Sequence, residues 1–116
     1  MPQEDCVFCQ IVAGTSQAKI IYQDEEITAF WDQYPAAPVH ILIVPNKHIP
    51  SINEVAEEDA YLLTKLIFKA REIAEDQGVR EKGYRLLFNI GKEGGQSVYH
   101  LHLHLFAGKH ILVVKD

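Results

Sequence analysis

The chain lacks a long hydrophobic segment and any excess of basic residues. No apolar run in its 116 residues approaches the roughly 20 residues of a membrane-spanning helix, which argues against a membrane protein. Lysine and arginine number 11 against 16 aspartates and glutamates. Binding to nucleic acid without sequence preference needs a basic surface, so DNA and RNA are not expected partners. Residues 1–5 are acidic and unlike a signal peptide, so we expect a cytoplasmic protein.

Cysteine is also scarce. The only two, Cys6 and Cys9, have the spacing Cys-x-x-Cys. A structural disulfide is not expected in a reducing cytosol, and a redox motif would need a thioredoxin-like βαβ setting that the sequence lacks. The pair is better explained as half of a metal site, for which zinc would need two further ligands.

The hydrophobic periodicity predicts two helices. A short helix passes through residues 11–13, where Asp5 can cap its start and Gly14 its end. A long helix covers about residues 57–77. Apolar residues at i, i+3 and i+4 spacing give the long helix one hydrophobic face, formed by Leu62, Leu63, Leu66, Ile67, Ala70, Ile73 and Ala74.

The remaining elements are strands, and together they predict a single α+β domain over residues 1–116. Strands are expected at residues 19–24, 27–31, 39–44, 84–89 and 99–106. Their short links favour a mainly antiparallel sheet of about five strands, accompanied by one long and one short helix. The apolar residues 110–114 could form another strand.

Three histidines alternate with leucine in the segment His100-Leu101-His102-Leu103-His104. Period-2 alternation is typical of a strand, so the leucines would enter the core and the histidines would share the other face, roughly 6–7 Å apart. Imidazole titrates near neutral pH, so such a row can bind metal or attack a phosphate. The preceding Gly94 and Gly95 allow close backbone approach to an anion, and Ser97 follows them.

These residues make the chain resemble the histidine triad (HIT) family, with its signature His-φ-His-φ-His-φ-φ, where φ is hydrophobic. The segment Gly94–His104 resembles most closely the Hint-like branch, the purine nucleoside phosphoramidases. Further matches are Phe30–Asp32, Pro38–Pro45, Lys47–Ile49 and Asn89–Gly91, and the resemblance covers about residues 5–108.

The resemblance implies hydrolysis of the P–N bond of adenosine or guanosine 5′-phosphoramidates through a nucleotidyl intermediate on His102. His104 would donate to the phosphate oxygens, and Ser97 would hold the phosphate or help a proton to reach the leaving amine. His40 would contact phosphate or tune His102, although a lone histidine in a strand is more often a core residue.

Other residues would hold the nucleoside and its phosphate. Asp32 would accept hydrogen bonds from the ribose hydroxyls, but it could equally cap the turn that follows it. By resemblance the remaining contacts would come from Val7, Phe8, Ile11, Phe30, Gln33, Asn89, Gly95 and Gln96. No organic cofactor is implied.

The resemblance also extends the cysteine pair to a four-ligand set. Cys6, Cys9, His48 and His100 would form a closed Cys₂His₂ site for a structural zinc ion. In that arrangement His100 holds metal and His102 carries out the chemistry.

Three other functions stay open at this point. The chain could cleave dinucleoside polyphosphates or transfer nucleotides with the same fold, act as a nucleotide-binding regulator of a protein partner, or carry metal on its three strand histidines. Residues 109–116 lack the Trp-Pro-Pro ending common in the Hint-like branch, which leaves the leaving group open. By resemblance, two copies would pair through the long helix and a sheet edge.

Overall fold

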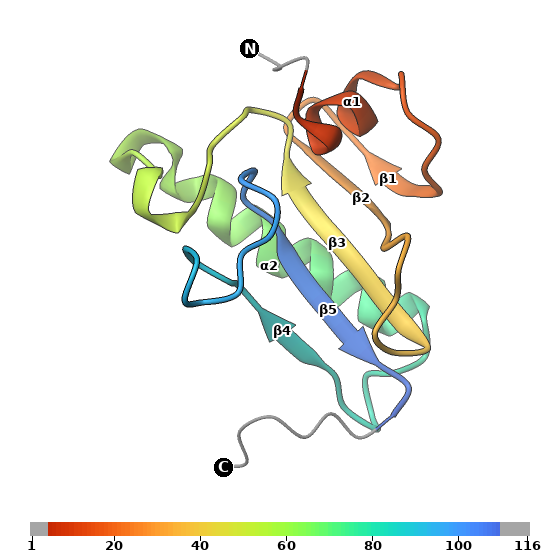
Figure 1. Ribbon diagram of the computed structural model, residues 1–116. Helices are drawn as coiled ribbons and strands as arrows, with labels where there is room; N and C mark the ends of the chain where they lie inside the picture. The colour runs from red at the N-terminus through yellow and green to blue at the C-terminus, as the bar shows by residue number, and fades with distance from the viewer. Residues whose placement is uncertain (1–4, 110–116) are drawn as a thin grey trace.

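The computed structural model describes residues 5–109 and contains a five-stranded sheet with a short and a long helix (Figure 1). Its elements are α1 (Val7–Ala13), β1 (Ile20–Gln23), β2 (Ile27–Trp31), β3 (Val39–Pro45), α2 (Ala60–Asp76), β4 (Arg85–Leu87) and β5 (Leu103–Ala107), with two 3₁₀ turns, Ile52–Glu54 and Glu57–Asp59, before α2. The strand order is β1-β2-β3-β5-β4, and all neighbours are antiparallel. The expected α+β class is confirmed, whereas the strand expected at 110–114 lies outside the described residues.

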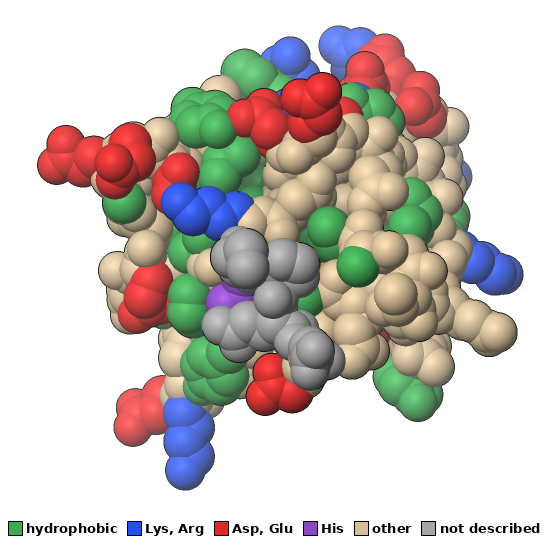
Figure 2. All heavy atoms as spheres, turned by 90° about the horizontal axis from the view of Figure 1, so that it is seen from above, with side chains coloured by type: hydrophobic (Ala, Val, Ile, Leu, Met, Phe, Trp, Pro, Cys, Tyr) green, Lys and Arg blue, Asp and Glu red, His purple; other side chains and the backbone are tan. Residues whose placement is uncertain are grey.

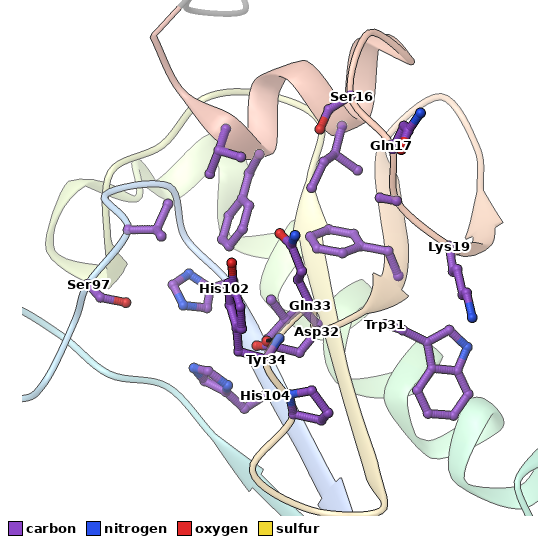
Figure 3. Close-up of a pocket in the computed structure, with 18 residues that line it drawn as sticks. Ser16, Gln17, Lys19, Trp31, Asp32, Gln33, Tyr34, Ser97, His102 and His104 are labelled. Carbon is purple, nitrogen blue, oxygen red and sulfur yellow. Dashed lines mark hydrogen bonds between the residues drawn. The ribbon is translucent and has the colours of Figure 1, made fainter.

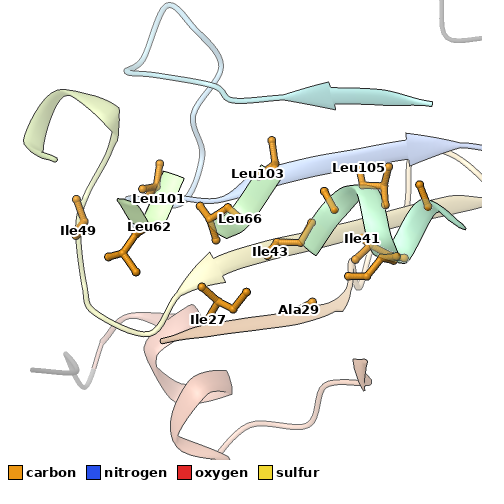
Figure 4. Close-up of a cluster of buried hydrophobic side chains, with 13 residues drawn as sticks. Ile27, Ala29, Ile41, Ile43, Ile49, Leu62, Leu66, Leu101, Leu103 and Leu105 are labelled. Carbon is orange, nitrogen blue, oxygen red and sulfur yellow. The ribbon is translucent and has the colours of Figure 1, made fainter. Parts of the chain in front are cut away.

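The main core lies between the sheet and α2, which covers one of its faces (Figure 4). Five of the seven expected apolar positions of α2 are buried there, namely Leu62, Leu66, Ala70, Ile73 and Ala74, while Ile67 is exposed. Burying a leucine or isoleucine side chain contributes about 1.5–3 kcal/mol. This layer therefore anchors the sheet and leaves its opposite face for the site.

The helix α1 packs on that opposite face, against Phe30, Leu42 and Val44. The sequence predicted that Asp5 caps α1, and this prediction is wrong. Cys6 is the N-cap, and its Sγ accepts a hydrogen bond from the Cys9 amide at 3.3 Å. A thiol therefore takes the place of the expected carboxylate. Gly14 ends the helix as predicted, with φ at 79°.

The histidine segment is only partly a strand, contrary to the expectation for residues 99–106. β5 begins at Leu103, which pairs with Ile43. The same register would place Leu101 opposite Pro45, which has no N–H, and the Leu101 amide instead donates to the Ile49 carbonyl at 2.7 Å. The alternation nevertheless holds, because Leu101, Leu103 and Leu105 are buried in the core beside α2.

The glycine pair before this segment has a structural explanation within the chain. A Cβ atom at Gly94 would lie 2.3 Å from the Ile90 carbonyl oxygen, and Gly95 has a φ of +86°. Both positions therefore exclude side chains independently of any ligand.

No helix of the described residues is long and apolar enough to cross a membrane. On the face seen in Figure 2, lysine and arginine side chains are scattered, with most near the rim and one group left of the centre, and acidic side chains lie beside several of them. The uncovered part of that face therefore carries no continuous basic patch.

Candidate functional site

An open cleft of about 1420 Å³ lies on the sheet face opposite α2 (Figure 3). Ser97, His102 and His104 lie on one side of it, and Ser16 and Lys19 lie on the other. Apolar side chains of α1, β2 and β3 form part of the lining, so the cleft combines a hydrophobic wall with a cluster of imidazoles. This is the usual composition of a small-molecule site.

The ring of His102 is held in one tautomer by the backbone. Its Nδ1 lies 2.7 Å from the carbonyl oxygen of His100. A carbonyl can only accept, so Nδ1 carries the proton and Nε2 keeps a free lone pair. Burial lowers the pKa of His102, which keeps the ring neutral at pH 7. His102 therefore presents an unprotonated ring nitrogen, a group that can act as a nucleophile, among the residues that line the cleft.

His40 and His104 form a second arrangement, the histidine relay. The Ala36 amide donates to His40 Nδ1 at 3.0 Å, so the proton of a neutral His40 is on Nε2. His40 Nε2 in turn lies 3.0 Å from His104 Nδ1 and donates to it. The proton of His104 is consequently on Nε2, which is buried and has no hydrogen-bond partner among the described residues.

An unpaired buried donor is costly unless a ligand satisfies it. His104 lines the cleft, and its ring centroid lies 4.9 Å from that of His102. Burial, reinforced by the neighbouring His102 and His40, lowers the pKa of His104 to about 4. The relay thus presents a neutral N–H donor beside His102.

Phe106 supports the relay, and sequence reasoning missed it. Its ring stacks on His104 at 5.2 Å and lies 4.3 Å from the His40 ring. The signal was its position two residues after His104, on the same face of β5. Asp32 completes the surroundings, because its Oδ2 lies 3.4 Å from His40 Nε2.

The four predicted metal ligands do come together, in what we call the cysteine–histidine cluster. Cys6, Cys9, His48 and His100 place their ligand atoms within 4.8 Å of one another. His100 Nδ1 is 3.4 Å from Cys6 Sγ, and His48 Nδ1 is 3.3 Å from Cys9 Sγ. His100 Nε2 donates to the Pro45 carbonyl at 2.8 Å, so the Nδ1 lone pair of His100 faces the sulfurs.

Asp32, His40 and His104 also bring three potential ligands within 4.8 Å. This second group does not fit a metal, because the Ala36 amide leaves the proton on His40 Nε2, the nitrogen that would have to coordinate. The cysteine–histidine cluster does fit a closed Cys₂His₂ zinc site, because His100 donates its Nε2–H to the Pro45 carbonyl and leaves Nδ1 free to bind metal.

The predicted nucleoside contacts divide into two groups. The cleft is lined by Val7, Phe8, Ile11, Phe30, Asp32, Gln33 and Ser97. Asp32 also serves as the turn residue that the alternative explanation predicted, since its Oδ1 accepts from the Tyr34 amide at 2.8 Å. The two explanations of Asp32 are therefore compatible.

Asn89, Gly95 and Gln96 are not among the residues that line the cleft. The Gln96 amide nitrogen donates to the carbonyls of Pro50 and Val98, and its oxygen accepts from the Gly91 amide. Gln96 therefore ties the loop before the histidines to the rest of the fold, a role that its motif position did not reveal.

Several lining residues were missed. Trp31, Tyr34 and Lys19 lie at the outer part of the cleft (Figure 3). The buried side chain of Leu42 also lines the cleft. Leu42 could have been found, because it is two residues after His40 on the same face of β3. Tyr34 carried no pattern signal, although it is 83% exposed.

Comparisons with known proteins show what the chain is similar to. A family model described as "Scavenger mRNA decapping enzyme C-term binding" matches residues 5–114. The purine nucleoside phosphoramidase of Escherichia coli (strain K12) is 45% identical over 106 residues, which cover 91% of this chain and 89% of that protein.

Two solved structures are also similar. A HIT family hydrolase from Legionella pneumophila Philadelphia 1 has a TM-score of 0.90 and 44% identity, covering 93% of this chain and 96% of its own. A Zn-bound histidine triad family protein from Mycobacterium smegmatis has a TM-score of 0.79 and 30% identity, covering 90% of this chain and 76% of its own.

Proposed function

Because the chain belongs to the histidine triad family and is an enzyme of that family, we propose that it hydrolyses the P–N bond of adenosine and guanosine 5′-phosphoramidates. The observation that carries the proposal is the pairing of two neighbouring imidazoles with complementary tautomers. His102 offers an open Nε2 lone pair, and His104 offers a buried Nε2–H donor beside it.

The reaction begins with attack of His102 Nε2 on the phosphorus. A bond forms between Nε2 and phosphorus, and the P–N bond breaks with its electron pair on the amine, which takes up a proton. The Nδ1–H bond to the His100 carbonyl supports the positive charge that develops on the ring. Water then attacks the phosphorus, releases one proton and displaces His102, which yields the nucleoside monophosphate.

Charge on the phosphate oxygens is met by the relay. His104 Nε2–H lacks a partner among the described residues and is positioned to donate as the charge on the oxygens grows. The ribose and base would occupy the apolar part of the cleft beside Phe8 and Phe30, whose rings meet edge to face at 5.4 Å. Asp32 would accept from the ribose hydroxyls, and Ser97 lines the cleft on the phosphate side.

We further propose that the cysteine–histidine cluster holds a structural zinc ion. Burial raises the pKa of the Cys6 thiol, and a divalent cation would offset this by stabilising the thiolate. The Zn-bound relative from Mycobacterium smegmatis supports the proposal. Zinc would tie α1 to the loop that follows β3 and to the histidine segment, and it would take no part in the chemistry.

A homodimer is part of the same proposal. β4 is an outer strand of the described sheet, and the α2 side chains Ile67 and Phe68 are 41% and 54% exposed. An outer strand and exposed apolar side chains are each features that favour pairing with a second copy.

The test of the proposed activity is incubation with an AMP–amine conjugate, followed by quantification of AMP and an alkaline quench that preserves an imidazole–phosphorus bond. We expect AMP release and an AMP adduct on His102. A dinucleoside polyphosphate serves as the parallel substrate. Cleavage of that compound alone would transfer the assignment to polyphosphate hydrolysis, and nucleotide binding without any turnover would favour a regulatory module.

A further inference from the structure

His100 belongs to both chemical groups of the molecule. Its side chain is fully buried, and its Nδ1 lies 3.4 Å from Cys6 Sγ and 3.5 Å from Cys9 Sγ. The backbone carbonyl of the same residue accepts a hydrogen bond from the Nδ1–H of His102 at 2.7 Å. His100 is therefore in hydrogen-bond contact with both cysteines and with His102.

The surroundings limit how His100 can move. Its Nε2 donates to the Pro45 carbonyl at the end of β3. The neighbouring Leu101 amide donates to the Ile49 carbonyl. Because this segment lies outside the ladder of β5, its carbonyl is positioned by these few bonds and by the cluster, not by a run of strand pairing.

We propose that His100 is a positioning residue that couples the cysteine–histidine cluster to catalysis: the metal held there fixes the His100 carbonyl, and this carbonyl keeps His102 in the tautomer that leaves Nε2 open. The inference rests on the proposed function for its effect on turnover. Its effect on the His102 ring can be measured without any substrate.

A merely structural role of the cluster predicts a different result. The helix α1 carries Phe8 between the two cysteines, and the Phe8 ring lies 5.0 Å from the His102 ring and lines the cleft. If losing the metal only loosened α1, the wall of the cleft would suffer first, and nucleotide affinity would fall together with turnover. The positioning role instead lowers turnover while affinity is retained.

The two histidine ligands provide a matched pair of variants, His100→Gln and His48→Gln. Each leaves two cysteines and one histidine, enough to hold zinc with water as the fourth ligand. Glutamine at position 100 can still donate to the Pro45 carbonyl. Only His100→Gln separates the metal from the backbone that orients His102, so His48→Gln is the control.

Three quantities are measured on zinc-loaded protein. Ring ¹H–¹⁵N correlation spectra report the tautomer of His102, single-turnover kinetics with the AMP–amine conjugate report the chemical step, and fluorescence of Trp31, the single tryptophan, reports AMP affinity at the cleft. We expect His100→Gln to lose the single Nδ1–H form and to react at least about tenfold more slowly than His48→Gln, with AMP affinity within about threefold.

Equal rates and unchanged His102 spectra in the two variants would overturn the proposal. So would a parallel fall of rate and affinity with the His102 signal intact, which indicates loosening of α1. If His100→Gln does not fold, spectra of the wild-type protein before and after treatment with a chelator replace it, and added zinc should restore the Nδ1–H form. A wild-type protein that cleaves no conjugate would refute the proposed function, while the spectra would still decide the coupling.

Discussion

The cysteine–histidine cluster and the histidine relay each combine a buried imidazole, His100 or His40, with a partly buried one, yet opposite backbone groups set the proton positions of the two buried rings. In the cluster, a carbonyl at Pro45 takes the proton of His100 Nε2 and leaves Nδ1 open as a ligand. In the relay, an amide at Ala36 donates to His40 Nδ1 and leaves Nε2 protonated. When a backbone carbonyl accepts from one ring nitrogen, the other nitrogen keeps a free lone pair. When a backbone amide donates to one ring nitrogen, the other nitrogen carries the proton and becomes a donor.

His102 follows the rule of the cluster, because a carbonyl holds its Nδ1–H. His102 lines the cleft and is not a member of the cluster. The proton positions of His100, His102 and His40 therefore depend on the backbone atom that each ring meets, whereas that of His104 depends on the Nε2–H of His40.

The largest effect is expected for His102→Ala. Among the described residues that line the cleft, His102 provides the one imidazole nitrogen with a free lone pair, Nε2. Without it, turnover of the AMP–amine conjugate should fall at least about a thousandfold. AMP affinity should stay within about tenfold, or roughly 1.4 kcal/mol. Steady-state kinetics and Trp31 fluorescence check the two values, and near-normal turnover would contradict the nucleophile assignment.

Removal of the cluster should mainly affect stability. Purified protein should carry about one zinc ion per chain, and variants in which both Cys6 and Cys9 are replaced, by serine or by alanine, should lose it because only two of the four ligands remain. The expected loss in free energy of unfolding is about 3–4 kcal/mol where free zinc exceeds Kd by about 100- to 1,000-fold. Elemental analysis and denaturant titration provide the measurement.

The same variants sharpen the comparison between the two groups. The relay remains intact in them, so any residual stoichiometric metal would show that Asp32, His40 and His104 also bind a cation. Wild-type protein purified without chelator and found free of metal would reject the zinc proposal.

A smaller effect is expected for His40→Leu. Without the His40 Nε2–H, His104 is free to carry its proton on Nδ1 and then has no donor for the phosphate. Loss of one such donor should lower kcat/KM about a hundredfold. His40→Gln is the control, since its amide N–H can still donate to His104 and should recover most of the activity. Equal losses in both variants would argue against the relay.

The smallest effect concerns pH. The pKa of His104 is about 4 in the folded protein, below its ordinary value of 6.5. Between these values the unfolded chain binds more protons, so the free energy of unfolding must fall as the pH falls from 6.5 to 4. One such group contributes a slope of at most about 1.4 kcal/mol per pH unit. Denaturant titrations at several pH values in this range give the free energy of unfolding as a function of pH. This free energy should change less with pH in His104→Gln than in the wild-type protein, and an identical pH dependence in the two proteins would contradict the shifted pKa.

Much of this organisation could be predicted from the sequence. The apolar periodicity predicted α2 and the buried leucines of the histidine segment. A helix that packs on a sheet buries residues at i, i+3 and i+4 spacing, and a strand buries every second residue. The resemblance identified the four members of the cluster although they are far apart in the chain. Amino-acid composition alone could not have predicted that Cys6 lies close to His100.

The remaining features depend on single atoms that a pattern does not encode. The start of β5 at Leu103 follows from the missing N–H of Pro45, and the Cys6 cap follows from the position of its Sγ. The side chain of Gln96 holds a loop although its motif implied a ligand contact. The tautomers of His40 and His104 follow from the Ala36 amide, which lies in a loop without any periodic signal.

Backbone groups fix these tautomers, for His104 through the side chain of His40, and ring ¹H–¹⁵N correlation spectra of the ligand-free, zinc-loaded protein with ¹⁵N-labelled histidine at neutral pH measure them. We expect a proton on Nδ1 of His102 and on Nε2 of His40 and His104, each as a single form. A proton on Nε2 of His102 or on Nδ1 of His104 would contradict this expectation, because the nucleophile and its donor would then have exchanged roles.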